Sequence, residues 1–410
     1  MKHPPLVQVG ILHAEQLRVR FNAAYVCRAD GQLHGVEQGT ETMVELRDGR
    51  LMCSGTPGNQ WCFEPADPGS DATFTLFDVP IGISFHWERK QTQTFRGELL
   101  IVVDEQQLCA INRLPVEEYL TSVISSEMSQ TASLEFLKAH AVISRSWLLA
   151  QCLHTASDSA LPPPDSATAH IRWYDHTQHT RFDVCADDHC QRYQGIGHAD
   201  NPTVRRAVEE TRGLVLTYGD EICDARFSKC CGGRTETFDT CWADTGKPYL
   251  AAIDDPYCNT SDTHVLSQVL NDYDQETTRF YRWTERLETD ELSLRIAGKL
   301  GIDVGTVIDL VPLRRGASGR ISLLRIVGTK RTIDVGKELE IRRALSPTHL
   351  LSSAFEVERT PSGFLLHGKG WGHGVGLCQI GAAVMGEQGK TFDEILRFYY
   401  RGANISKLYD

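Results

Sequence analysis

The sequence predicts an α+β protein of more than one domain, and three observations lead to that prediction. The first 112 or so residues carry short apolar alternations between glycine and proline turns, which is typical of β-strands. Residues 115–128 and 133–153 carry apolar side chains at helical spacing. At 410 residues, the chain is too long for one compact core.

These patterns divide the chain into four predicted segments. A β-rich region covers residues 1–112, and a core that contains the helical pair covers 113–265. A smaller α+β subdomain is inserted at 266–350. Residues 351–410 complete the core with a glycine-rich loop and the C-terminal helices.

Individual elements follow from local signals. The alternations at 6–9 and 98–103 predict strands, and residues 214–226 predict a hairpin because Gly219-Asp220 suits a two-residue type II′ turn. Further expected elements are a helix over 289–300, strands over 321–327, 332–335 and 363–366, and a helix over 377–385. The last helix is predicted to begin at a capping box, Thr391 to Glu394, and to end near Gly402.

Composition excludes several classes of partner. The net charge of −12 argues against nucleic acid and against anionic membranes. No apolar run approaches the roughly 18 residues that a membrane-spanning helix needs. The first five residues lack the apolar core of a signal peptide, so we expect either no signal peptide or one that has been removed.

The 13 cysteines are an odd number, which excludes a fully paired intramolecular set. Seven lie within 74 residues and predict a local metal site or one or two local disulfides: Cys185, Cys190, Cys223, Cys230, Cys231, Cys241 and Cys258. The other six are expected to be buried small hydrophobic residues: Cys27, Cys53, Cys62, Cys109, Cys152 and Cys378.

The glycine-rich loop is the segment HGKGWGHGVGLCQIG at residues 367–381, in which six of the fifteen residues are glycine. A loop this poor in side chains allows backbone to pass close to another group. A phosphate site is one alternative, but neither nucleotide-binding motif of glycine-rich loops fits. A tight crossing of two backbones is another, although it leaves His373 and Gln379 unexplained.

Two charged residues fall on apolar helical stripes. Glu127 continues the stripe of Val116, Leu120, Val123 and Ile124. It is either a hydrated helix end or a carboxyl group whose burial favours the protonated form that a general acid needs. On the second helix, Arg145 either contacts substrate or a neighbouring loop, or extends to solvent.

Two long motifs carry a family resemblance. The run RLPVEEYLTSVISSEMSQTASLEFLKAHAVISRSWLLA and the run HGKGWGHGVGLCQIGAAVMGEQGKTFDEILRFYYRGANI resemble signatures of the SpoIID/LytB family. The segments HCQRYQG, FSKCCGGRTE and KPYLAAIDD lie between them in the family's order. The resemblance covers about residues 95 to 410.

The resemblance implies a lytic transglycosylase that cleaves peptidoglycan glycan strands stripped of stem peptides, with Glu127 as its acid and base. The implied enzyme is expected to need no cofactor for catalysis. The groove is expected between the 115–150 helices and the glycine-rich loop. The implied substrate-binding residues are Arg145, Tyr193, Ser228, Arg234, His373 and Gln379.

The family also contains members that resemble cell-wall-binding modifiers, which stimulate a partner amidase and cleave nothing themselves. That class is the alternative function. Either function implies a location outside the cytoplasm or at the cell wall.

This chain departs from the family pattern at four positions. Cys378 replaces a serine, Ile380 a tyrosine, Ser129 a proline and His140 a glutamine. None of these changes removes the acid. A nucleophilic pair of Cys378 and His373 is a further alternative, although no third group is evident to orient it.

The metal prediction centres on Cys185, His189 and Cys190, whose spacing suits zinc. Some clostridial relatives resemble this segment and bind zinc through a cysteine and a histidine, which implies Cys185 and His189 as ligands of a structural zinc ion. A disulfide from Cys190 to Cys230 or Cys231, or free thiols, is the alternative. Four histidines are expected on the surface of a loop: His170, His176, His179 and His198.

Overall fold

The computed structural model describes residues 3–29, 32–53, 55–82, 88–129, 131–153, 161–174, 179–187, 189–197, 201–270, 274–275, 277 and 279–410. It has the predicted mixed α+β character. The chain forms two compact units. The first comprises Met1–Gln130, His176–Leu214 and Lys407–Asp410, and the second comprises Thr131–Asp175 and Val215–Ser406.

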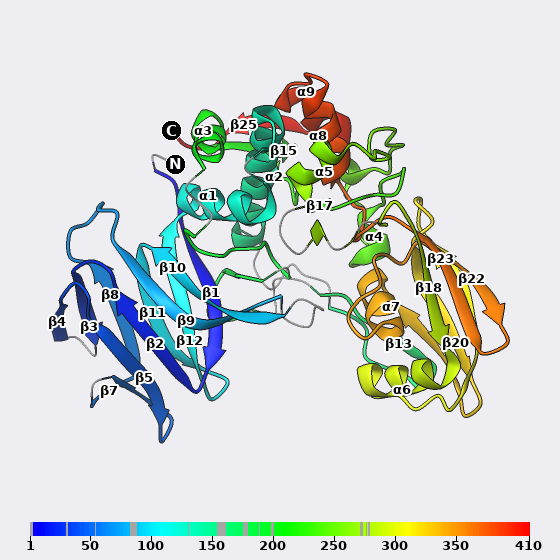
Figure 1. The fold of residues 1–410 in the computed structure, drawn as a ribbon, viewed down its shortest axis with the longest axis horizontal. Coiled ribbons are helices and arrows are strands. Elements are labelled where there is room, and N and C mark those ends of the chain that lie inside the picture. The colour runs from blue at the N-terminus through cyan, green and yellow to red at the C-terminus, as the bar shows by residue number, and fades with distance from the viewer. Residues whose placement is uncertain are drawn as a thin grey trace. The chain divides into compact units, whose positions relative to one another are not determined.

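The first unit is a β-sandwich whose described residues also form the helices α1 and α3 (Figure 1). One sheet has the strand order β14-β1-β12-β11-β8-β3-β4, and the other has the order β10-β9-β2-β5-β6-β7. The strands are β1 (Leu6–Ala14), β2 (Gln16–Phe21), β3 (Tyr25–Ala29), β4 (Gln32–Val36), β5 (Glu41–Arg47), β6 (Arg50–Cys53), β7 (Thr56–Gly58), β8 (Gln60–Pro65), β9 (Thr73–Ile81), β10 (Arg89–Arg96), β11 (Glu98–Asp104), β12 (Gln107–Pro115) and β14 (Val184–Cys185).

Aromatic side chains join the two sheets of the sandwich. Phe21 of β2 lies 4.8 Å from Phe63 of β8 and 5.1 Å from Tyr25 of β3, measured between ring centroids. Every second residue of β2 from Leu17 to Phe21 is buried, because successive side chains of a strand point to opposite faces. The apolar alternations therefore build the core of this unit.

Helix α1 (Val116–Glu127) packs on β1 and β12 and on helix α3 (Pro202–Glu210). The predicted helix over 115–128 is confirmed. The side chain of Asn201 caps α3 by accepting hydrogen bonds from the backbone amides of Thr203 and Val204. Because α1 packs on the sandwich, it belongs to the first unit, whereas the sequence grouped it with the second predicted helix.

The second unit contains that second helix, α2 (Leu134–Leu153), and four small sheets with the strand orders β13-β21-β20-β19, β18-β23-β22, β16-β15-β25 and β17-β24. The strands are β13 (Ala169–Ile171), β15 (Leu214–Tyr218), β16 (Glu221–Ile222), β17 (Phe227–Ser228), β18 (Arg282–Glu288), β19 (Val307–Arg315), β20 (Ile321–Gly328), β21 (Thr332–Gly336), β22 (Phe355–Thr360), β23 (Gly363–Lys369), β24 (Leu377–Cys378) and β25 (Asn404–Lys407). Its other helices are α4 (Phe238–Cys241), α5 (Thr263–Val269), α6 (Thr289–Leu300), α7 (Glu338–Leu345), α8 (Gln379–Glu387) and α9 (Phe392–Tyr399).

Local predictions in this unit agree with the structure. Gly219 has φ +60° between β15 and β16, as the first central residue of a type II′ turn requires. The capping box at Thr391 and Glu394 is present at the start of α9. The predicted helix over 377–385 begins two residues late, because Leu377 and Cys378 first pair with β17.

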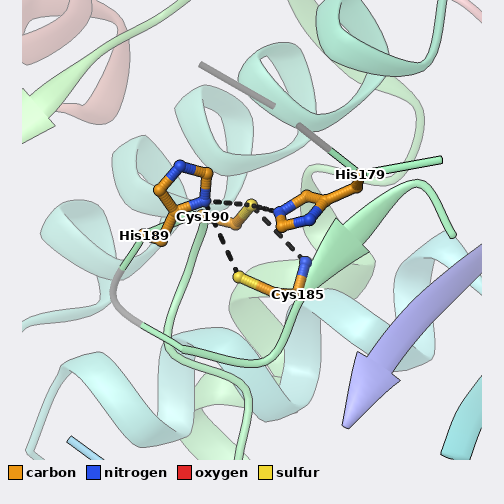
Figure 2. A group of neighbouring side chains, drawn as sticks. All are labelled: His179, Cys185, His189 and Cys190. Atoms are coloured by element: carbon orange, nitrogen blue, oxygen red, sulfur yellow. Dashed lines mark hydrogen bonds between the residues drawn. The ribbon is translucent and has the colours of Figure 1, made fainter. Parts of the chain in front are cut away.

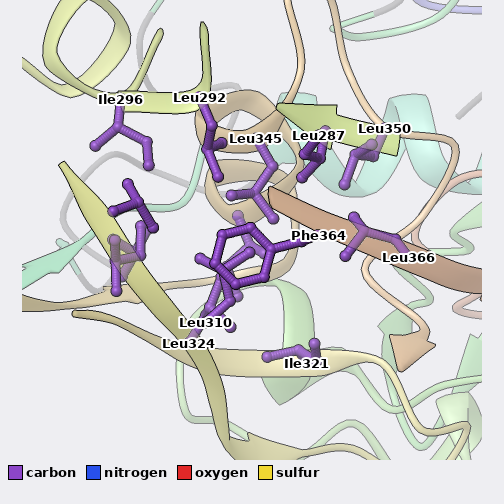
Figure 3. Close-up of a cluster of buried hydrophobic side chains, with 14 of the residues drawn as sticks. Leu287, Leu292, Ile296, Leu310, Ile321, Leu324, Leu345, Leu350, Phe364 and Leu366 are labelled. Atoms are coloured by element: carbon purple, nitrogen blue, oxygen red, sulfur yellow. The ribbon is translucent and has the colours of Figure 1, made fainter. Parts of the chain in front are cut away.

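The inserted subdomain extends beyond its predicted end at residue 350. Strands β22 and β23 pair with β18, and Phe364 and Leu366 of β23 lie in the same hydrophobic core as α6, α7 and β20 (Figure 3). Sequence patterns locate elements but do not show which distant segments share a core, so the four predicted segments differ from the two observed units. None of the described helices is both long and apolar enough to cross a membrane.

Truncation in this core has a predictable cost. Leu324→Ala is expected to lower the free energy of unfolding by about 2–5 kcal/mol, because the fully buried side chain leaves a cavity. The matched control is Leu313→Ala on the adjacent strand β19, where the leucine is 41% exposed. The control should change stability by no more than about 0.5 kcal/mol in urea unfolding. Equal effects of the two variants would contradict the assigned core.

Candidate functional site

Glu127 is the last residue of α1, and it is buried. Only 8% of the residue is exposed, so the alternative of a hydrated helix end does not hold. The backbone N–H of Arg192 donates a hydrogen bond to its Oε1 at 3.4 Å. The structure therefore holds this carboxyl group in place through a neutral main-chain donor.

The other two carboxylates of α1 have structural partners. Glu117 accepts hydrogen bonds from the backbone N–H of Gly213 at 3.2 Å and from the hydroxyl of Tyr409 at 2.7 Å. Glu118 forms an ion pair with Arg96 at 2.8 Å. All three carboxylates of α1 therefore have a hydrogen-bond or ion-pair partner within the unit.

The segment that carries Arg192 is itself fixed by buried polar contacts. The hydroxyl of Tyr193 donates to Oδ1 of Asn112 at 2.5 Å, and its ring stacks on Tyr119 at 5.2 Å. The hydroxyl of Tyr119 donates to Gln191 at 3.1 Å. Burial raises the pKa of Tyr193, which is only 1% exposed. The structure therefore places Tyr193 in the core that positions Arg192, and its predicted contact with substrate stays a prediction.

Four side chains from the segment before Arg192 bring sulfur and imidazole nitrogen atoms close together (Figure 2). They are His179, Cys185, His189 and Cys190. Cys190 Sγ lies 3.4 Å from His179 Nε2 and 3.5 Å from His189 Nδ1. His189 Nδ1 lies 3.8 Å from Cys185 Sγ. His179, expected on the surface, is half-buried, and its ring adds a fourth donor to the group.

Strand β14 anchors this set to the sandwich. Cys185 pairs with Gly10 of β1, and the backbone N–H of Ala186 donates to the Gly10 carbonyl at 2.9 Å. A side chain at position 10 would clash, because its Cβ would lie 2.5 Å from the ring of Phe182. The glycine thus lets the segment that carries Cys185 approach the sheet.

The donor set fits zinc. In a tetrahedral site with Zn–S of about 2.3 Å and Zn–N of about 2.0 Å, neighbouring ligand atoms lie about 3.3–3.8 Å apart. Hydrogen bonds from Cys190 and the two histidines hold the pKa of the Cys185 thiol well below its ordinary value, and the thiolate is the form that binds metal. No disulfide is formed among the cysteines that the structure describes.

A cavity of about 350 Å³ lies beside these ligands in the first unit. Its lining includes His13, Phe182, His189, Arg192 and Tyr193. Three of the four candidate ligands (His179, Cys185 and His189) and Arg192, whose backbone contacts Glu127, therefore line one hollow.

The remaining predicted surface histidines have different environments. His170 is buried, and its Nε2 lies 3.2 Å from Glu340. His176 and His198 lie outside the described residues. Cys152, predicted to be buried, is exposed at the end of α2.

The glycine-rich loop belongs to the second unit, and Arg320 organises its backbone. The Arg320 guanidinium donates to the carbonyl of Gly372 at 2.9 and 3.1 Å and to the carbonyl of Cys231 at 3.2 Å. Gly374 has φ +75°, and a Cβ there would lie 2.4 Å from the guanidinium. A buried arginine that the sequence did not single out thus explains part of the glycine pattern.

His373 and Gln379 have partners inside this unit. His373 Nδ1 accepts a hydrogen bond from the backbone N–H of Val375 at 3.0 Å, and its ring lies against Trp242. Burial, followed by the nearby Arg226 guanidinium, holds the pKa of His373 well below its ordinary range. Gln379 is buried and donates from Nε2 to Nε2 of His140 at 3.1 Å.

The other predicted substrate-binding residues also lie in the second unit. Arg145 is completely buried in α2, so the alternative in which it extends to solvent is wrong. Ser228 is buried in β17, and Arg234 is exposed and pairs with Asp254 at 2.8 Å. Cys378 accepts from the backbone N–H of Cys231 at 3.3 Å, a contact that does not involve His373.

The buried His140 predicts a pH dependence of stability. Burial, followed by Lys229, lowers its pKa from 6.5 to about 3. Below pH 6.5 the unfolded chain therefore binds a proton that the folded protein does not, so stability is lost as the pH falls from 6.5 toward 3.

His140→Gln should reduce this loss. We expect the free energy of unfolding in urea to fall less for the variant than for the wild type between neutral pH and the acidic range. His349, whose pKa is also lowered to about 3, keeps part of the dependence in both proteins. Identical pH profiles would show that His140 contributes none of it.

The comparisons with known proteins agree with these motifs. The model of the family described as "Stage II sporulation protein" matches residues 104–218, and that of a "Domain of unknown function (DUF8618)" matches residues 236–376. An uncharacterized protein of Brachyspira hyodysenteriae (strain ATCC 49526 / WA1) is 28% identical over 320 residues, which cover 76% of this chain and 72% of that protein.

Two named relatives come from Bacillus subtilis (strain 168). Its stage II sporulation protein D is 26% identical over 300 residues, which cover 73% of this chain and 76% of the relative. Its amidase enhancer is 26% identical over 316 residues, which cover 70% of this chain and 40% of the relative. These matches support the resemblance of the chain to the SpoIID/LytB family.

Proposed function

We propose that the protein is a lytic transglycosylase that cleaves peptidoglycan glycan strands without water, with Glu127 as acid and base. The similarity of the chain to the SpoIID/LytB family supports a role connected with the bacterial cell wall. The observation that carries the finer proposal is the buried carboxyl group at the end of α1, held by the backbone amide of Arg192. We expect glycan strands stripped of stem peptides to be the preferred substrate.

A single carboxyl group is sufficient for this reaction. Glu127 donates its proton to the glycosidic oxygen as the bond from that oxygen to the anomeric carbon breaks. The C6 hydroxyl oxygen of the same sugar then bonds to the anomeric carbon, and the Glu127 carboxylate takes the hydroxyl proton. The products are a 1,6-anhydro sugar and a new free 4-hydroxyl, and no water is consumed.

A hydrolase would need a second carboxyl group, about 5–9 Å from the first. On α1, the other two carboxylates are engaged by Tyr409 and Arg96. This arrangement favours the one-carboxyl reaction over hydrolysis.

We also propose that His179, Cys185, His189 and Cys190 bind a structural zinc ion. When bound, zinc would crosslink the loop and take no part in proton transfer. His189 and Cys190 immediately precede the segment whose residue Arg192 donates to Glu127. The zinc ion would therefore act by fixing the backbone amide that positions the acid.

A second candidate function follows from the similarity to the amidase enhancer. In that case, the protein would bind cell wall and stimulate a partner amidase. Either function implies action outside the cytoplasm, where peptidoglycan lies.

One assay separates the two functions. Peptide-free glycan strands and intact peptidoglycan are each incubated with the protein alone, with a cell-wall amidase alone, and with both. We expect soluble glycan fragments from peptide-free strands with the protein alone. If fragments never appear and the amidase rate rises only when the protein is added, the modifier is correct and the transglycosylase is wrong.

A further inference from the structure

A second group of side chains that could hold a metal ion is buried in the second unit, whereas Glu127 belongs to the first. The Sγ atoms of Cys231, Cys258 and Cys378 and a carboxylate oxygen of Asp255 all lie within 4.8 Å of one another. We propose that these four residues form a structural zinc site. It is independent of the proposed function.

The measured distances suit four ligands around one ion. Cys231 Sγ lies 3.3 Å from Asp255 Oδ2 and 3.5 Å from Cys258 Sγ. Tetrahedral zinc with Zn–S of about 2.3 Å separates neighbouring sulfurs by about 3.8 Å. A small movement of the side chains is enough to bring every donor to bonding distance.

The backbone beside the sulfurs supplies a hydrogen bond of the kind that stabilises metal-bound thiolates. The N–H of Cys231 donates to Cys378 Sγ at 3.3 Å. Gly232 and Gly233 have φ of +81° and +108°, a conformation that favours glycine. The two glycines therefore allow the chain to turn directly after Cys231.

Asp255 is held with one oxygen toward the sulfurs. Its Oδ1 accepts from the backbone amides of Tyr257 and Cys258 at 2.9 and 3.2 Å. Its Oδ2 faces Cys231 and accepts from the hydroxyl of Tyr399 at 3.1 Å. Such contacts orient a carboxylate ligand and are typical of the surroundings of metal sites.

Gly381 leaves no room beside the site for a side chain larger than hydrogen. A Cβ at Gly381 would lie 2.6 Å from Asp255 Oδ2 and 2.2 Å from the Tyr399 hydroxyl. The four ligands are at most 2% exposed. A carboxylate buried this deeply is costly unless a cation compensates it, and three sulfur donors select a soft ion such as zinc.

A disulfide explains less of this arrangement. A bond between Cys231 and Cys258 would use two sulfurs and leave Cys378 and Asp255 buried beside it without a cation. Zinc uses all four donors. It would link three segments of the unit that are distant in sequence, because Cys378 lies 147 positions after Cys231. It would fix the end of the glycine-rich loop, and its binding energy would contribute to folding.

The test counts zinc in the full chain, purified with reductant and desalted. We expect two ions per wild-type chain and one per chain of the double variant His179→Ala, His189→Ala, which lacks two of the four ligands of the first group. A third substitution in this double variant, either Cys258→Ser or Cys378→Ser, should remove the remaining ion. Serine is the residue usual in the family at position 378. Adding Cys223→Ser, a buried cysteine of the same unit outside the group, should leave it in place.

X-ray absorption at the zinc edge gives a second readout that does not depend on removing a ligand from the second group. In the double histidine variant, we expect a shell dominated by sulfur at about 2.3 Å and no imidazole signal. The proposal is overturned if that variant holds no zinc, or if its zinc shows imidazole ligands. It is also overturned if peptide mapping of the wild type finds Cys231 and Cys258 joined as a disulfide. The zinc counts of the wild type and the double histidine variant together separate the two sites. One ion in both proteins means that the His179–Cys190 site alone fails, whereas one ion in the wild type and none in the variant means that this site alone fails.

Discussion

Glu127→Gln is expected to lower the rate of glycan cleavage by about 10²–10⁴-fold, the range typical of general acid catalysis. The amide has nearly the shape of the carboxyl group and can still accept from the backbone N–H of Arg192, but it cannot donate a proton to the glycosidic oxygen. Cleavage of peptide-free glycan strands under single-turnover conditions measures the rate. The thermal midpoint should remain close to that of the wild type.

The matched control is Glu118→Gln on the same helix. It removes a carboxylate that pairs with Arg96 at the surface, so the cleavage rate should stay within a few-fold of the wild type. If Glu127→Gln cleaves as fast as this control, Glu127 is not the acid.

Loss of the His179–Cys190 metal site is the second large expected effect. Cys185→Ser and His189→Ala should each lose one zinc ion per chain, lower the thermal midpoint and slow glycan cleavage. The physical reason is that the segment ending at Arg192 is no longer crosslinked, so the amide that positions Glu127 becomes less ordered. Zinc content, thermal unfolding and cleavage are measured on the same preparations.

His34→Ala serves as the control, because this exposed histidine of β4 lies outside both groups of metal ligands. It should change none of the three measurements. A metal-site variant that loses zinc but keeps the wild-type cleavage rate would show that the ion does not help to position the acid.

Local sequence signals predicted much of the fold. The helical spacing of apolar residues located α1 and α2 to within about two residues, which is the usual uncertainty of helix ends. Gly219 predicted the turn between β15 and β16, and Thr391 with Glu394 predicted the start of α9. Each of these signals lies within a few residues of the structure that it specifies.

Long-range contacts were beyond the reach of such signals. The two predicted helices fall in different units, because α1 packs on the sandwich and α2 packs with α8 and α9. Arg320 lies in the turn that precedes β20, and its guanidinium donates to the Gly372 carbonyl of the glycine-rich loop. Nothing in its neighbouring sequence indicates that this arginine is buried. Only the folded chain shows why the glycines are needed there.

The candidate metal ligands divide in the same way. Cys185 and His189 are close in sequence and were proposed from their spacing, whereas the structure adds His179, which lies six residues before Cys185. Cys378 was expected to be a simple buried residue, and its contact with Cys231 depends on the parallel pairing of β17 with β24. A search for histidine and cysteine on both sides of each short motif would have found His179 but not Cys378.

The chemistry of the new glycan ends tests the central claim most directly. Peptide-free strands are digested with wild-type protein in water labelled with heavy oxygen, and the fragments are analysed by mass spectrometry. We predict 1,6-anhydro ends that are one water lighter than hydrolysis products and carry no label. Reducing ends that carry the label would contradict the account, because they would show that water, and not the C6 hydroxyl, attacks the anomeric carbon.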